Sequence, residues 1–257
     1  MKTILFGQKQ GWMQKIQAAA NPAKFGPEFR EFNDPEVQFR DYDYVVPVQL
    51  RDYGPLWRRH AGGPVNFLIP NPGVVAMCDD KIQWDGFLRF NGFDEFAPCM
   101  YNGTVSYPFI YKKRQDEWGA HSRIIHSLEE KEKLETIIVR DDYFKQEYVS
   151  GRIEYVTHVL AVKGKPYYML TYEHGFDTEY FIKGKWANFS THREVETPCT
   201  DVLCSILETL NYTGTCCFNY KYADGVPKIF EMNPRYGATL TLTINDYLDA
   251  YVNALAA

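Results

Sequence analysis

Short apolar segments alternate with helix-like segments over the first eighty residues. Residues 3–6 form an apolar run typical of a buried strand, and Gly7 opens a turn before the weakly amphipathic residues 12–20, which predict a helix. A strand, a helix and a further strand are predicted next, at residues 44–48, 50–61 and 66–69. Residues 21–40 lack a clear period and predict an irregular connection. Strands that alternate with helices predict a parallel sheet.

The pattern changes after residue 78. Asp79 and Asp80 can cap a helix whose inward face includes Ile82, Phe87 and Leu88 and could extend to Phe90. Aromatic and β-branched segments then predict mainly antiparallel strands, at residues 109–112, 136–139, 144–148, 155–162 and 167–172. A helix, two strands and a closing helix complete the chain at residues 201–210, 215–222, 228–232 and 245–255. This second part therefore has an α+β texture.

Composition narrows the classes of partner. The chain has 257 residues, 45% of them hydrophobic, and a formal net charge of −5, which gives no general attraction to nucleic acid or anionic lipid. No segment approaches the roughly 20 apolar residues of a membrane span, and the N-terminal apolar run is too short for a secretory leader. The six cysteines form no CxxC pair and are expected to be reduced packing residues. We therefore expect a cytoplasmic protein with no nucleic acid or membrane partner; the aromatic content leaves a homodimer open.

The most informative string is TGTCCFNYKYADGVPKIFEMNPRYG, residues 213–237. It predicts two antiparallel strands joined at Asp224 and Gly225, because this pair suits a tight hairpin turn. Side chains alternate along a strand, so Glu231 and Asn233 share one face, and Asn219 can join them from the partner strand. Their oxygens are the hard ligands that Mg²⁺ prefers, and Arg235 could hold a phosphate. From spacing alone, a capped turn without a ligand is equally well supported.

A family resemblance changes this balance. The string EMNPRYG resembles the signature that closes the nucleotide-binding core of the ATP-grasp superfamily, which implies that Glu231 and Asn233 bind magnesium and that Arg235 faces phosphates or the reacting group. Relatives mostly have Asp or Glu where Asn219 stands, which implies that one of two magnesium positions is weak here. Three further blocks follow the family's order along nearly the whole chain from about residue 44.

The other blocks imply the nucleotide contacts. Asp80–Lys81 and YPFIYKK at residues 107–113 resemble the segments whose lysines, here Lys81 and Lys112, reach the phosphates. Read alone, Lys112 would be a solvated lysine at a strand end. A loop at residues 114–123, with Gly119 and Ser122, would close over the phosphates, although it has fewer glycines than the loops of many relatives. The string at residues 145–160 resembles the hinge strand, which implies that Gln146, Glu147 and Val149 receive the adenine and Glu154 the ribose.

The resemblance also implies a domain division and a reaction. It predicts an N-terminal α/β domain like the pre-ATP-grasp domain at residues 1–78, then the ATP-grasp domain at 79–257, with a small lobe at about 100–148 and a C-terminal lobe at about 149–257. Such ligases transfer the γ-phosphoryl group of ATP, with Mg²⁺ or Mn²⁺, to a carboxylate and join the acylphosphate to an amine; Lys112 and Arg235 would be catalytic.

Two other functions remain compatible with these motifs: a small-molecule kinase on the same scaffold, and an ATP-binding regulatory protein without turnover. The sequence does not assign a role to His158, Lys183 or Arg193. Relatives often have an acid where His158 stands, and Lys183 and Arg193 lie where relatives often carry substrate-facing basic groups, but no motif fixes either of them. The acid and the amine are not identified by the sequence.

Overall fold

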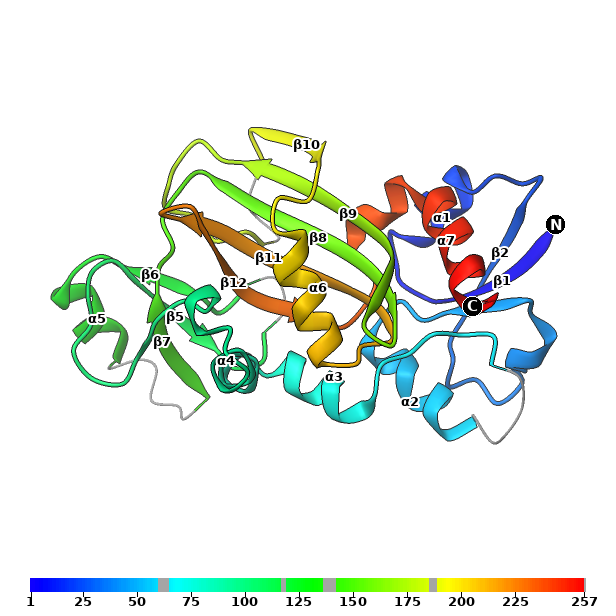
Figure 1. Ribbon diagram of the computed structural model, residues 1–257, viewed down its shortest axis with the longest axis horizontal. Helices are drawn as coiled ribbons and strands as arrows, with labels where there is room; N and C mark the ends of the chain where they lie inside the picture. The colour runs from blue at the N-terminus through cyan, green and yellow to red at the C-terminus, as the bar shows by residue number, and fades with distance from the viewer. Residues whose placement is uncertain (60–64, 117–118, 136–141, 185–188, 257) are drawn as a thin grey trace.

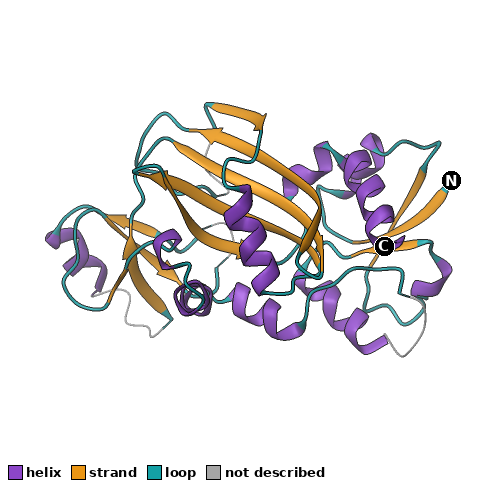
Figure 2. Ribbon diagram, in the orientation of Figure 1, coloured by secondary structure: helices purple, strands orange, loops and turns teal. Residues whose placement is uncertain are grey.

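The computed structural model describes residues 1–59, 65–116, 119–135, 142–184 and 189–256, and three sheets organise these residues. A small parallel sheet lies at the end of the molecule that holds both chain termini, a five-stranded antiparallel sheet lies in the middle, and a four-stranded antiparallel sheet lies at the other end (Figure 1). Figure 2 shows helices beside each sheet. This mixed architecture confirms the predicted fold class: an α/β part followed by two lobes on antiparallel sheets.

The N-terminal sheet has the strand order β2-β1-β3, with both pairs parallel as predicted. Ile4, Leu5 and Phe6 of the central strand are fully buried, which explains the short apolar run in the sequence. The bounds of this part are β1 Lys2–Gly7, α1 Met13–Ala19, β2 Phe25–Arg30, η1 Phe39–Asp41, β3 Tyr44–Val46 and α2 Leu50–Arg59.

Two predictions for this part were wrong. Strand β2 lies inside the segment expected to be irregular, because its backbone pairs with β1 over six positions despite Gly26 and Pro27. Pro27 is tolerated because β2 is an edge strand. Residues 66–69 are not a strand: the Asn66 carbonyl accepts one backbone hydrogen bond from the Val45 amide, and the chain continues into the next helix.

Two capped helices connect the parallel sheet to the rest of the molecule. The side chain of Asn71 accepts a hydrogen bond from the Gly73 amide at the start of α3, and Asp80 accepts from the amides of Ile82 and Gln83 at the start of α4. These caps fix where both helices begin. The bounds are α3 Pro72–Asp79, α4 Lys81–Phe90 and η2 Asp94–Phe96.

The small lobe is built on the antiparallel order β4-β7-β5-β6. Its bounds are β4 Met100–Tyr101, β5 Phe109–Lys113, β6 Arg123–Ile125, α5 Leu128–Glu135 and β7 Tyr143–Glu147. Phe109, Tyr111 and Ile125 form its own small core. The strand predicted at residues 136–139 lies outside the described residues.

The large antiparallel sheet has the order β10-β9-β8-β11-β12. Tight turns with positive φ at Lys163–Gly164 and Asp224–Gly225 join its two hairpins, the second of them as the sequence predicted. The bounds are β8 Ile153–Val162, β9 Lys165–Gly175, β10 Thr191–Val195, α6 Thr200–Thr209, β11 Gly214–Ala223, β12 Val226–Asn233, η3 Ala238–Leu242 and α7 Ile244–Ala256.

Helices α4 and α6 cover one face of the large sheet, and α7 and a cavity share the other. Trp84 and Leu88 of α4 and Leu203 of α6 pack with Phe218 and Met232 of the sheet. A second core joins the two ends of the chain, because β1, α1 and α7 share it with β8 and β9. No helix among the described residues is long and apolar enough to cross a membrane.

Candidate functional site

A cavity of about 350 Å³ lies where the two antiparallel sheets face each other. The large sheet supplies its floor, strands β5 and β7 supply one wall, and the segments around Ser122 and Lys183 supply another. Trp12 from the N-terminal part and residues 237–239 also line it. The cavity therefore collects side chains from every part of the chain.

Strand periodicity explains which residues form the floor. Phe218 and Tyr220 of β11 point into the helix-covered core, so the residues between and beside them, Cys217, Asn219 and Lys221, line the cavity. A register shift opposite Asn219 and Tyr220 leaves Phe230 as an extra residue in β12. This bulge allows Phe230 and Glu231 both to reach the cavity, although they are adjacent in sequence.

Glu231, Asn219 and Asn233, the three predicted metal ligands, lie together. The side-chain amides of Asn219 and Asn233 donate to Oε1 of Glu231 at 2.9 and 3.0 Å. Burial raises the pKa of Glu231, but Lys81, the Asn233 hydrogen bond and Lys112 outweigh burial and lower it overall. Glu231 is therefore held as a carboxylate.

Lys81 connects Glu231 to the loop over the cavity. Its ammonium lies 3.5 Å from Oε2 of Glu231 and donates to the backbone carbonyl of Asp116 at 3.0 Å. Because Lys81 is the first residue of α4, the Asp80 cap sets its position. Asp80 also accepts from the guanidinium of Arg114, which lies two residues before Asp116. Asp80 therefore holds both the start of α4 and the beginning of the loop.

Lys112 lies close to the same carboxylate, on β5. Its ammonium donates to Oε1 of Gln146 at 2.9 Å and lies 5.1 Å from the centre of the Phe230 ring. Burial lowers the pKa of Lys112 to about 8, although Glu231 opposes this shift. The interpretation of Lys112 as a solvated strand-end lysine was wrong. Gln146, predicted to meet the adenine, is almost fully buried and its side chain contacts Lys112 and Met100 instead.

The predicted hinge segment borders the cavity beside a buried lysine. Glu147 and Val149 line the cavity, and Glu147 accepts from the Cys99 amide at 2.9 Å. Lys221 donates to the carbonyls of Val149 and Gly151, both at 3.2 Å, and its ammonium lies 3.8 Å from the centre of the Phe181 ring. Burial lowers the pKa of Lys221 to about 8. Phe181 and the hinge thus form an apolar wall with one cation at its edge.

Glu154, predicted to hold the ribose, is paired with a residue that sequence reasoning did not select. The Lys183 ammonium lies 2.6 Å from Oε1 of Glu154 and donates to Oδ1 of Asn219 at 2.9 Å. No periodic pattern surrounds Lys183, so its position could not be predicted. Lys221, in contrast, lies two residues after Asn219, and the same alternation that selected Asn219 could have selected it.

Arg235 and His158 lie at the opposite end of the floor. Arg235 donates to Oδ1 of Asn233 at 3.4 Å. His158 is fully buried and bonds to the Thr239 hydroxyl through Nε2, and its Nδ1 has no hydrogen-bond partner among the described residues. Burial, with Lys183 and Arg235 nearby, lowers the pKa of His158 to about 3, so the ring is neutral at physiological pH. A Cβ on Gly237 would lie 2.1 Å from the His158 ring, which explains the glycine.

The donor set around Glu231 fits one hard divalent cation. Glu231 supplies a carboxylate, and Asn233 supplies an amide oxygen that accepts only a long hydrogen bond of 3.4 Å from Arg235, whereas the oxygen of Asn219 accepts from Lys183 at 2.9 Å. No group of three or more His, Cys, Asp and Glu side chains suited to a metal occurs within the part of the chain that the structure describes. A magnesium ion here would therefore complete its shell with phosphate oxygens and water.

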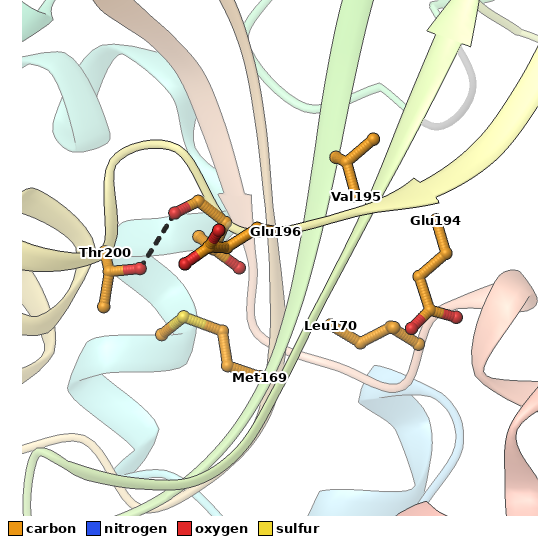
Figure 3. A pocket seen from close by; sticks show the side chains of 7 residues that line it. Met169, Leu170, Glu194, Val195, Glu196 and Thr200 are labelled. Carbon is orange, nitrogen blue, oxygen red and sulfur yellow. Dashed lines mark hydrogen bonds between the residues drawn. The ribbon is translucent and has the colours of Figure 1, made fainter.

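Ser122, predicted to contact the nucleotide, is buried on the cavity wall, and its amide donates to the Gly119 carbonyl at 3.0 Å. Glu117 and Trp118 of the predicted loop lie outside the described residues. A second, open hollow lies between β9, β10 and α6 (Figure 3). Its charged residues are Glu194 and Glu196, without a cation, so it does not share the chemistry of the main cavity.

Comparison with known proteins identifies the fold. No family model matches the sequence, and no curated protein matches it. Among solved structures, D-alanine–D-alanine ligase from Bacillus anthracis superposes with a TM-score of 0.66 at 16% identity, covering 100% of this chain and 97% of that one. Phosphoribosylamine–glycine ligase from Thermotoga maritima gives 0.72 at 16% identity, covering 99% and 75%. L-amino acid ligase from Bacillus licheniformis gives 0.64 at 14%, covering 99% and 74%. The chain has the ATP-grasp fold.

Proposed function

We propose that this chain is an ATP-dependent ligase that joins a carboxylate to an amine, releasing ADP and phosphate. The observation that carries the proposal is the convergence of Lys81, Lys112 and Arg235 with the Glu231 cluster in one cavity between two lobes. The similar structures are named as ligases, and one of them, from Bacillus anthracis, is a complex with ATP. ATP with Mg²⁺, or Mn²⁺ in its place, would be the nucleotide substrate.

The cavity's two ends suggest how the substrates are arranged. The apolar wall of Val149 and Phe181 suits a planar base, and Glu154, which lines the same cavity, would accept from ribose hydroxyls. The cations Lys81 and Lys112 would then lie along the phosphates, as Arg235 would near the transferred group. The carboxylate and amine substrates would enter beside Trp12 and Thr239, which line the far end.

The reaction follows from this arrangement. The γ-phosphoryl group passes to the substrate carboxylate, and the amine attacks the resulting acylphosphate and displaces phosphate. A divalent cation at Glu231 and Asn233 would neutralise charge on the phosphates when bound. Lys112 and Arg235 would stabilise the negative charge that develops during transfer, and the described parts of the loop, residues 114–116 and 119–123, would exclude water that hydrolyses the acylphosphate. No nucleophilic side chain is required.

An ADP-release screen tests the proposal. Purified protein is incubated with ATP, Mg²⁺ and pairs of small acids and amines, and the condensed product is detected by mass spectrometry. Lys112→Met should lower kcat/KM by about 10²–10³-fold, because one preorganised charge at the transition state is lost. Lys113→Met is the matched control, because Lys113 lies on the same strand as Lys112 but does not line the cavity. Its ammonium lies 3.4 Å from the carboxylate of Asp142.

Hydroxylamine separates the alternatives. A ligase forms a hydroxamate from its activated acid, whereas a small-molecule kinase releases ADP without one. Binding of ATP with no ADP release across the whole screen would support a regulatory nucleotide-binding protein and contradict the ligase. We also propose a cytoplasmic location, which is supported by six cysteines that are all free thiols.

A further inference from the structure

Lys221 places a cation in the apolar wall where the base of a nucleotide is proposed to lie. The residue lines the cavity and is only 2% exposed. Its ammonium lies 3.8 Å from the centre of the Phe181 ring and 5.0 Å from the centre of the Tyr148 ring, and both of these residues line the same cavity. A planar base that packs against this wall would therefore meet the ammonium.

The Lys221 ammonium and the Val149 carbonyl form an adjacent donor and acceptor. The ammonium donates to the carbonyls of Val149 and Gly151, both at 3.2 Å, and to the Tyr148 hydroxyl at 3.4 Å. These bonds are longer than is usual for a charged donor, and the longest can be exchanged for a ligand oxygen, because the Tyr148 hydroxyl still accepts from the Phe181 amide at 2.8 Å. The Val149 carbonyl has a second lone pair, which can accept from a ligand N–H.

Purine bases differ at the edge that would meet this pair. Adenine has an amino donor at C6 and an acceptor at N1, whereas a 6-oxopurine, such as hypoxanthine, has an acceptor oxygen at C6 and an N–H donor at N1. One donor beside one acceptor can serve either edge. Without the ammonium, the Val149 carbonyl could still accept from the adenine amino group, but an oxygen at C6 would lose its cationic donor.

We propose that Lys221 widens the specificity of the nucleotide site, so that the site binds 6-oxopurine nucleotides about as well as adenine nucleotides. Gln146, predicted to meet the adenine, does not line the cavity and contacts Lys112 and Met100 instead, so it does not select the amino group. Glu147, which does line the cavity, can accept from an amino group or from an N1–H alike. The proposal rests on the proposed nucleotide site and extends it to a second class of base.

A comparison of two bases tests the proposal. The full chain is titrated in a calorimeter with the Mg²⁺ complexes of a non-hydrolysable ATP analogue and of the matching ITP analogue, which differ only at C6 and N1 of the base. The two Kd values should agree within about tenfold, because neither base leaves a buried polar group without a partner. A Kd of the ITP analogue more than about tenfold above that of the ATP analogue would overturn the proposal and leave the proposed function standing. No binding of either analogue would overturn both.

Lys221→Met gives a readout that a purely structural role would not move. The substitution removes the ammonium and keeps an unbranched apolar side chain in the wall. The ratio of the Kd of the ITP analogue to that of the ATP analogue should rise by about ten- to hundredfold, because only the oxygen at C6 is left without its donor. Retained binding of the ATP analogue shows that the variant is folded. An unchanged ratio would overturn the role of Lys221.

Lys228 provides the matched control, since it is the cross-strand neighbour of Lys221, donates to the Glu95 carbonyl at 2.6 Å and does not line the cavity. Lys228→Met should leave the ratio as in the wild type, and an equal shift in both variants would overturn the proposal. The wild type gives a test that needs no variant: a matching analogue with hydrogen at C6 should bind about tenfold more weakly than the ITP analogue. Equal binding of these two would also overturn the proposal.

Discussion

A half-buried lysine among the proposed phosphate-binding groups makes the site sensitive to pH. The pKa of Lys112 is about 8, compared with about 10.4 for a free lysine, because burial disfavours its ammonium form. Above pH 8 the unliganded protein holds this lysine mostly neutral. Binding of a triphosphate requires the ammonium, so the protein must take up a proton as it binds.

We therefore expect the Kd of the Mg²⁺–analogue complex to rise about tenfold between pH 7 and pH 9, as expected when one group of pKa about 8 must be protonated. Lys112→Arg should remove most of this dependence, because a guanidinium stays charged over this range. Calorimetric titration at several pH values measures both. A profile that is identical in wild type and Lys112→Arg would show that another group controls binding; Lys221, whose pKa is also about 8, is the first candidate.

At the scale of single residues, sequence predicted what strand periodicity determines. Glu231, Asn233 and Asn219 could be placed on one face because side chains alternate with period two. Lys183 could not be placed, since it lies in a segment without a period and its position depends on contacts with two other strands. Gln146 was assigned to the nucleotide from its motif, but the burial of Lys112 beside it could not be seen in the sequence.

Among the secondary-structure elements, α4 links stability to the site. Asp80 caps this helix through two backbone amides and also accepts from Arg114, while the next residue, Lys81, contacts Glu231. Burial raises the pKa of Asp80, but the bonds from Arg114 and from the helix amides outweigh burial and lower it overall. The first turn of α4 thus fixes the backbone position of Lys81, a proposed phosphate-binding lysine.

Asp80→Ala should lower the free energy of unfolding by about 1–2 kcal/mol, mainly through the lost cap; the Arg114 pair adds little because that side chain is 40% exposed. The substitution should also weaken nucleotide binding, because the cap no longer fixes the backbone of Lys81 at the start of α4. Asp80→Asn keeps an acceptor for the cap and should lose less than half as much. Glu129→Ala, which removes an exposed helix pair with Lys133, is the control for both urea unfolding and binding. Equal losses in Asp80→Ala and Glu129→Ala would contradict the role of the cap.

Elements were predictable where a local signal agreed with the final packing. The β11–β12 hairpin has apolar alternation and an Asp-Gly turn, whose residues have φ values of 50° and 79°. Strand β2 has neither signal, because FGPEFR contains Gly and Pro, and only its partner β1 makes it a strand. The expected inward face of α4 was wrong at two positions: Phe90 is 91% exposed, whereas Trp84, which was not assigned to that face, is 1% exposed and stacks beside Phe87.

At the scale of the whole molecule, the last helix packs against the N-terminal sheet. Tyr247 and Tyr251 of α7 lie in one core with Ile4 and Phe6 of β1 and with Leu160 of the large sheet. The Tyr251 hydroxyl donates to the Val45 carbonyl and accepts from the Leu68 amide, both at 2.8 Å. The N-terminal sheet therefore depends on a helix about two hundred positions later in the chain. These contacts join residues on both sides of the domain boundary predicted at residue 78. We therefore expect the two parts to unfold together.

Tyr251→Phe keeps the ring and removes only the hydroxyl, so it leaves a buried amide and a buried carbonyl without their partner. We expect a loss of about 1–3 kcal/mol in the free energy of unfolding, measured by urea denaturation. Tyr180→Phe, at a site 42% exposed, should change stability little and is the control. Circular dichroism and tryptophan fluorescence should give one coincident transition in all three proteins. Two transitions, with Tyr251→Phe shifting only one, would show that the N-terminal domain unfolds separately. Leu240 of η3, directly after the cavity residue Thr239, belongs to the same core, so a saturating nucleotide should stabilise the single transition as a whole.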